Sequence, residues 1–453
     1  MYVGVSRLLH TGVLAGAQFG QAAAGISDYQ LMQLRRRAAG VVGGVAAGKD
    51  ANLVLVAADA RWGDKADPAF SAHADTVVQW AEAVWSGLLP IEAMQRTIRK
   101  AKLELARAKR QWSVVKGPAA ATVATLARIG WTAVDATTAY SDQGDEVAFT
   151  KDPPAMVKKM IHDAVRRWRW RQAGMTGEGS EGRREAEVVW KPVADLIARG
   201  RWREPDVTAD QRMEVICKGE QVALRSAVVG GQWPQVRLFQ AGLCEVPWCA
   251  LCLAYGIEVR GTIIHRVYMC PHVEARVGTK RPQELNEEWE KRGKGVGEGM
   301  REGAKAMEWE RGLVTGTAFI RMKREEKFVR VMEPQGLVEE ANIYMDGSMF
   351  DGFCEDLAAC GWAFAIVKGG AVVGLARGVP PCHVRSIPAT EAWALAMAVD
   401  RVVLASAQFF TDCKSVRDLV NAGVKKATSA RQQNARIWNT LFSRTDGESP
   451  RVE

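Results

Sequence analysis

The chain has 453 residues, 47% of them hydrophobic, a size that suits about two to four globular domains with apolar cores. It contains nine unevenly spread cysteines and no run of about 18 apolar residues, which argues against a disulfide framework and a membrane span and favours an intracellular protein, nuclear or cytoplasmic. The net charge of +9 has the sign of a nucleic-acid binder, although an ordinary basic protein carries the same charge.

Residues 1–175 have the periodicity of a basic, mainly helical region. The stretch 92–117 carries eight Lys or Arg against two Glu. A helix is also predicted over 155–172. It ends in alternating arginine and tryptophan, a pattern that suits phosphate contact together with base stacking. The alternative is that its tryptophans lie in the core and its arginines on a solvated face. The candidate nucleic-acid contacts in this helix are Arg166, Arg167, Arg169 and Arg171.

Residues 176–283 combine a helical segment with a cluster of four potential metal ligands. Cys249 and Cys252 are followed after twelve residues by His265 and after four more by Cys270. Three thiolates and an imidazole suit one tetrahedral zinc ion, and four protein ligands make that ion structural rather than catalytic. The alternative is a group of small buried thiols with a surface histidine. Two residues are possible replacements for one of the ligands, His272 and, less well placed, Cys244.

Residues 284–336 are charged and rich in glycine, and they are predicted to form a linker. Three carboxylates follow it in similar contexts. Asp346 closes a strand-like stretch, Glu391 lies in the first turn of a predicted helix, and Asp412 ends a buried strand. Such acids can converge on a pocket that binds divalent metal and cleaves a phosphodiester, and their mutual repulsion should raise at least one pKa. Taken singly, each acid could equally be an exposed or capping carboxylate.

Two residues beside Asp346 are further candidates for contact with nucleic acid. Gly347 has no side chain and would permit close approach of a phosphate backbone, and Ser348 offers a hydroxyl group. Between Asp346 and Glu391, two strand-like stretches are expected to form a hairpin around Gly369-Gly370, a favoured two-residue turn.

The order strand–strand–strand–helix–strand–helix in 337–453, with intervals of 45 and 21 residues between the three acids, resembles the type 1 ribonuclease H domain. The resemblance implies an α/β fold with a mixed sheet and hydrolysis of the RNA strand of an RNA–DNA hybrid. Two magnesium ions would be held by the three acids, with Asp346 bridging both. In the family a fifth strand, a loop with a histidine and a last helix with a fourth carboxylate follow, whereas this sequence stops at 450–453, which resembles the start of that strand.

The cysteine cluster, with the preceding 237–242 and the ending Cys270-Pro271-His272, resembles the zinc-binding segment after the reverse transcriptase domain of many non-LTR retrotransposon polyproteins. Residues 1–175 resemble, more generally, the region after the polymerase active site, and the polymerase signature itself is absent. The predicted parts are therefore a basic helical region at 1–175, a helical segment with a zinc knuckle at 176–283, a linker at 284–336 and a ribonuclease H-like domain at 337–453 that lacks its last elements.

The function that these resemblances imply is an RNA–DNA hybrid ribonuclease within a retroelement-derived protein. Its partner would be the hybrid or another nucleic acid, with no membrane. The alternative is a catalytically inactive nucleic-acid-binding remnant of a retroelement polyprotein, which would keep the zinc module and the basic helices. A third and weaker interpretation is a structural scaffold without salt-sensitive binding to nucleic acid.

Overall fold

The fold is taken from a computed structural model. It describes residues 12, 14–43, 49–174, 193, 196–197, 201–203, 213–215, 217–278, 280, 283–288, 290, 326–350 and 358–453. These residues form two compact units. Unit 1 draws on 1–17, 29–69 and 166–318, and unit 2 draws on 18–28, 70–165 and 319–453. Most of the predicted linker at 284–336 lies outside the described residues, and the boundaries of the four predicted parts stay a prediction.

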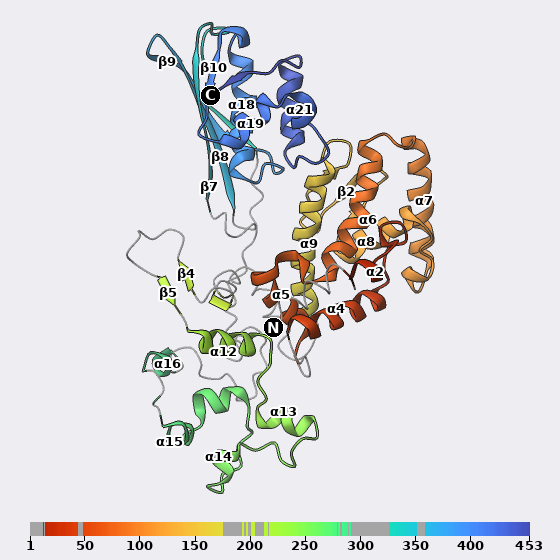
Figure 1. Cartoon of the computed structure of the whole chain (residues 1–453), viewed down its shortest axis with the longest axis vertical. Coiled ribbons are helices and arrows are strands. Elements are labelled where there is room, and N and C mark those ends of the chain that lie inside the picture. The colour runs from red at the N-terminus through yellow and green to blue at the C-terminus, as the bar shows by residue number, and fades with distance from the viewer. Residues whose placement is uncertain are drawn as a thin grey trace. The chain divides into compact units, whose positions relative to one another are not determined.

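Unit 1 is built mainly from helices, labelled in Figure 1. Near its N-terminal end are α2 (Ala15–Ala17), α4 (Asp28–Val42), α5 (Ala51–Trp62), the short η2 (Gly63–Lys65) and the last part of α9 (Pro154–Gly174). Further along are β4 (Arg201–Arg203), paired with β5 (Met213–Val215), then α12 (Lys218–Val228), α13 (Gln235–Gln240), α14 (Ala250–Leu253), η4 (His265–Met269), α15 (Val273–Val277) and α16 (Gln283–Glu288).

The first part of unit 2 is a group of helices with a small sheet. The helices are α3 (Gln21–Ala24), α6 (Pro68–Trp85), α7 (Ile91–Arg107), η3 (Gln111–Ser113) and α8 (Pro118–Arg128). The antiparallel sheet contains β1 (Thr132–Ala133), β2 (Thr138–Tyr140) and β3 (Glu146–Ala148). The sequence had indicated helices here and missed this sheet. Strands of two or three residues are too short to show the alternation of apolar and polar residues that predicts a strand. The turn between β1 and β2 depends on Asp135, whose carboxylate accepts hydrogen bonds from the Thr137 and Thr138 N–H groups.

The second part of unit 2 is a six-stranded mixed sheet in the order β11-β10-β7-β8-β9-β6. Strands β6 (Lys327–Met332), β7 (Asn342–Phe350), β8 (Ala359–Lys368) and β9 (Ala371–Val379) pair antiparallel. Strand β10 (Gln408–Phe410) is parallel to β7, and β11 (Arg451–Val452) is parallel to β10. The helices are α18 (Ile387–Ala398), η6 (Val399–Arg401), η7 (Leu404–Ser406), α19 (Lys414–Asn421), α20 (Val424–Ala427) and α21 (Ala435–Arg444).

Most of the elements expected in this part are present. The hairpin turns at Gly369 and Gly370, whose φ angles of 56° and 81° are those of a primed turn. Helix α18 begins after Ser386, whose hydroxyl accepts a bond from the Ala389 N–H. The end of the chain does form a strand, β11. The edge strand β6 was not expected, because it falls in the predicted linker.

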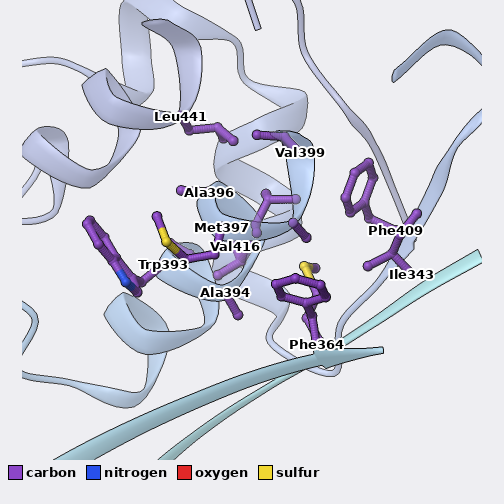
Figure 2. Close-up of a cluster of buried hydrophobic side chains, with 14 of the residues drawn as sticks. Ile343, Phe364, Trp393, Ala394, Ala396, Met397, Val399, Phe409, Val416 and Leu441 are labelled. Atoms are coloured by element: carbon purple, nitrogen blue, oxygen red, sulfur yellow. The ribbon is translucent and has the colours of Figure 1, made fainter. Parts of the chain in front are cut away.

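The core of the sheet domain lies between one sheet face and α18, as Figure 2 shows. Strand β7 alternates as the sequence indicated, with Ile343 and Met345 buried and Tyr344 and Asp346 exposed. Helix α18 is buried along almost its whole length, because it packs on β7 and β8 on one side and on α21 on the other. Figure 1 shows α18, α19 and α21 on the same side of the sheet.

Glycine at position 347 allows α18 to approach the sheet. A Cβ atom there would lie 2.7 Å from both the Glu391 nitrogen and the Thr390 hydroxyl, closer than real side chains come. The φ angle of Gly347 is not positive, so its role is close packing rather than an unusual backbone conformation. Gly347 is buried against the helix, a position different from the open approach to a phosphate backbone expected from the sequence.

We expect Gly347→Ala to destabilise the sheet domain by about 1–3 kcal/mol, because the added methyl group would push α18 away from β7. Urea unfolding followed by hydrogen exchange in 342–368 would measure this. The matched control is Gly40→Ala in α4, where a Cβ meets nothing within 4 Å and should stabilise by up to about 1 kcal/mol. Equal stability of Gly347→Ala and the wild type would contradict the packing argument.

Candidate functional site

The structure brings the three predicted acids to one region of the sheet domain. Asp346 lies on β7 and Asp412 follows β10. Because Phe410 is paired with Tyr344 in these parallel strands, the two aspartates stand level on neighbouring strands. Glu391 is the fifth residue of α18 and lies at the start of its second turn rather than in the first turn expected from the sequence, and α18 packs on β7. Asp346 and Asp412 are exposed, whereas Glu391 is 1% exposed.

Glu391 is held by the backbone of β7 and by a threonine. Its Oε1 accepts a hydrogen bond of 2.6 Å from the Gly347 N–H, and its Oε2 accepts one of 3.1 Å from the Thr411 hydroxyl. The Thr411 Oγ1 in turn accepts a bond of 3.0 Å from the Cys413 N–H. Thr411 therefore fixes the glutamate from the β10 side. Sequence reasoning missed this residue, since a threonine one position before a candidate acid carries no distinguishing signal.

Burial raises the pKa of Glu391, because the charged carboxylate loses its hydration. The bonds from Gly347 and Thr411 act in the opposite direction, and the nearby charges of Asp412 and Asp346 raise the pKa further. A raised pKa is the shift expected for crowded carboxylates, but desolvation of Glu391 contributes more to this shift than repulsion from the two aspartates does.

Ser348 lies one residue beyond Gly347 and is half-buried. Its hydroxyl donates a hydrogen bond of 3.4 Å to the Gly361 carbonyl of β8. The structure thus gives Gly347 and Ser348 contacts inside the sheet domain, and their contact with nucleic acid stays a prediction.

The four predicted zinc ligands form one compact, buried cluster. The Cys252 Sγ lies 3.3 Å from the His265 Nε2 and 3.7 Å from the Cys270 Sγ, and the Cys249 Sγ lies 3.9 Å from the Cys270 Sγ. Disulfide sulfurs would be about 2.05 Å apart, so these thiols are not paired. Ligand sulfurs of a tetrahedral zinc site, with bonds of about 2.3 Å, lie about 3.8 Å apart. The cluster can therefore bind a metal ion such as zinc.

The backbone prepares Cys249 to bind a cation as a thiolate. Burial opposes its ionisation, but the N–H groups of Cys252 and Leu251 point at its sulfur and lower its pKa. The pKa of Cys252 is raised to about 12, because the thiol is desolvated and lies among the other sulfurs. Gly261 packs against the Cys249 backbone, where a Cβ atom would lie 3.1 Å from the Cys249 Cα. The four ligand atoms can therefore share one cation.

The two possible replacement ligands are used otherwise. The Cys244 thiol donates to the carbonyl groups of Gln235 and Val246. His272 stacks on Tyr255 with ring centroids 4.0 Å apart. In the described part of the chain, only the cluster of Cys249, Cys252, His265 and Cys270 has ligand atoms that all lie within 4.8 Å of one another, and the three carboxylates do not form such a group.

The structure places Arg169, one of the four predicted contacts with nucleic acid, in the interior of unit 1. Arg169 is 2% exposed, and its Nη1 lies 3.6 Å from the Asp67 carboxylate, which also accepts bonds from Arg35. Although burial opposes ionisation, these two arginines hold the pKa of Asp67 below its usual value. Trp168 and Trp170 are buried as well, as the core alternative for the tryptophans had indicated.

The other three arginines of this helix also have contacts within the protein. The Arg166 Nη2 donates to both Asp64 oxygens at 2.8 Å while remaining 40% exposed. Arg167 and Arg171 are half-buried, and each makes an interaction within the chain. Their binding to nucleic acid stays a prediction.

The comparisons with known proteins identify no relative: neither a protein family, nor a curated protein, nor a solved structure matches this chain. None of the helices in the described ranges combines the length and the apolar character that crossing a bilayer requires.

Removing a cysteine of the cluster should abolish metal binding. We expect the wild-type chain to carry about one equivalent of zinc, and Cys252→Ser to carry little and to lose hydrogen-exchange protection between 235 and 278, because the metal supplies much of the stability of such a small module. Zinc analysis of the purified chain measures this. Cys244→Ser, the same substitution at a thiol outside the cluster, should keep its zinc. A wild-type chain without zinc after metal-supplemented folding would disprove the site.

The raised pKa of Glu391 has a consequence for stability. The unfolded chain releases the Glu391 proton near pH 4.5, whereas the folded chain keeps it to a higher pH. Proton binding by Glu391 therefore contributes its full share to the free energy of unfolding below pH 4.5, and this share is lost as pH rises through the pKa of the folded state. Relative to Glu391→Gln, the wild-type sheet domain should therefore lose stability with rising pH above 4.5 in magnesium-free buffer. Hydrogen exchange of β7 at several pH values measures this difference. Parallel pH curves for the two proteins would count against a raised pKa.

Proposed function

We propose that the sheet domain is a ribonuclease H-like nuclease domain that hydrolyses the RNA strand of RNA–DNA hybrids, in a protein derived from a retroelement. The observation that carries the proposal is the convergence of Asp346, Glu391 and Asp412 from β7, α18 and the end of β10. One of these acids is buried and two are exposed, so the group offers both a fixed anchor and open oxygens.

The arrangement of the elements supports the fold part of the proposal. Strands β7, β8 and β9 form an antiparallel meander, α18 crosses the sheet, and β10 returns parallel to β7 before α19. This is the order that the resemblance to ribonuclease H implies. Strand β11 adds a second parallel strand at the edge beside β10.

The donor set suits magnesium. Mg²⁺ prefers carboxylate oxygens, retains several waters and is usually held by one or two carboxylates together with substrate phosphates. The oxygens of the three acids do not all lie within 4.8 Å of one another, so the acids do not form a closed cage by themselves. Asp346 and Asp412 would present oxygens to the ions and Glu391 would complete the set. Two bound ions would supply Lewis-acid stabilisation of the charge that develops on the phosphodiester.

The protein residues would orient these oxygens. Gly347 and Thr411 each donate one hydrogen bond to the Glu391 carboxylate, and each carboxylate oxygen still has a second lone pair for a cation or a ribose 2′-hydroxyl. A contact with the 2′-hydroxyl would distinguish RNA from DNA. In the cysteine cluster, we propose one structural zinc ion.

One observation favours the alternative, an inactive nucleic-acid-binding remnant of a retroelement polyprotein. Both Glu391 oxygens accept bonds from the protein, as those of a purely structural carboxylate would. In that case the basic surfaces and the zinc module would account for the function.

Cleavage of a labelled RNA–DNA hybrid with magnesium tests the two functions. Asp346→Asn should lower the cleavage rate by about 100-fold or more, because even residues one step removed from a bound metal cost 10- to 100-fold. Asp346 is exposed, so the variant should fold as the wild type does. The control is Asp418→Asn, the same change at an exposed acid of α19, which should cleave normally.

No cleavage by the wild type, with binding of the hybrid retained, would favour the inactive remnant. Cleavage that Asp346→Asn leaves unchanged would exclude the carboxylate site as its source.

A further inference from the structure

The helical part of unit 2 contains a groove of about 1000 Å³ that the proposed nuclease chemistry does not use. It lies among residues of α3, α6, α7 and α8. Part of its lining is exposed apolar surface, because Leu88 and Leu89 are 73% and 51% exposed. Lys100 and Arg107 of α7 and Lys116 before α8 line it as well and are exposed.

This groove belongs to a strongly basic surface. All eight Lys and Arg side chains of 92–117 are exposed, against two Glu, which leaves an excess of six positive charges. Within the described chain, the ion pair that these cations form is Lys100 with Glu104, at 3.9 Å and with both side chains exposed, so it neutralises little. The Lys102 Nζ donates to the Val134 carbonyl. These positive charges are therefore clustered in one segment of the sequence and exposed to solvent in the structure.

The helix geometry explains why the cations stay together. Met94, Ile98, Ala101 and Leu105 form the buried stripe of α7 at spacings of four, three and four residues. Lys100 and Arg107 are seven residues apart, two helical turns, and so project from the same side of α7 about 10 Å apart along its axis. A polyanion lying along α7 can meet both of them.

We propose that this groove binds a single-stranded segment of nucleic acid, with phosphates on Lys100, Arg107 and Lys116 and bases against Leu88 and Leu89. A cationic groove with apolar surface is the combination that proteins use to hold single strands without sequence preference. A duplex keeps its bases stacked inside and would leave the apolar wall unused. A flat anionic membrane would reach the rim but not the interior, where Thr76 and Met94 are 1% and 2% exposed.

The experiment measures binding of a fluorescent 15-nucleotide oligouridylate to the full chain between 50 and 200 mM salt. In Lys100→Gln/Arg107→Gln/Lys116→Gln, the slope of log affinity against log salt should fall by about 2, since each lost phosphate contact of a single strand removes about 0.7. Binding at 0.1 M salt should weaken by up to about 100-fold on the same arithmetic. All three side chains are exposed, so folding should be unaffected.

The matched control removes the same charge elsewhere. Arg36→Gln/Arg37→Gln/Lys65→Gln neutralises three exposed cations of unit 1 and should keep the wild-type slope. Leu88→Ser/Leu89→Ser should weaken binding without changing the slope, because it removes apolar contact only.

Equal salt slopes for the groove variant and the charge-matched control would overturn the proposal. So would a duplex of the same length binding as tightly as the single strand. Charge-dependent binding to anionic lipid vesicles without binding to the oligonucleotide would also overturn it.

Discussion

Helix α18 can lie against β7 because position 347 has no side chain, and the resulting contact places a buried carboxylate beside two exposed ones. The Gly347 N–H donates to Glu391, and the Thr411 hydroxyl donates to the same carboxylate from β10. These two bonds link the helix to β7 and to the residue that follows β10. A buried carboxylate normally costs several kcal/mol, and hydrogen bonds of this kind offset much of that cost. The packing of α18 on β7 and the position of the buried carboxylate therefore both depend on the contact between Gly347 and Glu391.

The two candidate metal sites differ in the way their chemistry requires. The thiol cluster is closed, since its four ligands are buried and their spacing already matches a tetrahedral ion. The carboxylate group is open, with Asp346 and Asp412 in solvent. Soft ligands in a closed shell suit a structural ion, and hard oxygens with free positions suit an ion that must also meet a substrate. The chain thus separates the part that a metal would stabilise from the part where a metal would act.

How far the sequence predicts this structure depends on whether an element carries its own signal. The hairpin at Gly369-Gly370 and the start of α18 depend on residues close in sequence, and the sequence predicted both. The ligand spacing of the cysteine cluster predicted which four residues meet. Strand β6 could not be predicted in this way: five of its six residues are exposed, so it shows no alternation, and only pairing with the distant β9 makes it a strand. Thr411 was missed for a related reason, because its role depends on a partner twenty residues away.

Whether a basic residue is buried in an ion pair or exposed to solvent depends on the acidic residues near it in the fold rather than on the number of charges near it in the sequence. Arg169 stands in an arginine- and tryptophan-rich run that indicated nucleic-acid binding, yet Asp67 draws it into the interior of unit 1. In the sheet part of unit 2, Arg385 and Arg436 pair at 2.7 and 2.8 Å with Asp145 and Asp152 of the helical part.

Those two ion pairs join the parts of unit 2 that carry the groove and the carboxylates. His383 is half-buried near both arginines, and desolvation together with their charges lowers its pKa to about 3, so it stays neutral and adds no repulsion to the junction. The cations of 92–117 have no comparable acids: their one ion pair in the described chain is exposed and 3.9 Å long. Elsewhere in the chain, Arg385 and Arg436 pair with aspartates at hydrogen-bond distance. The cations of 92–117 have no such pairs among the described residues, so a polyanionic ligand could supply the negative charges that neutralise them.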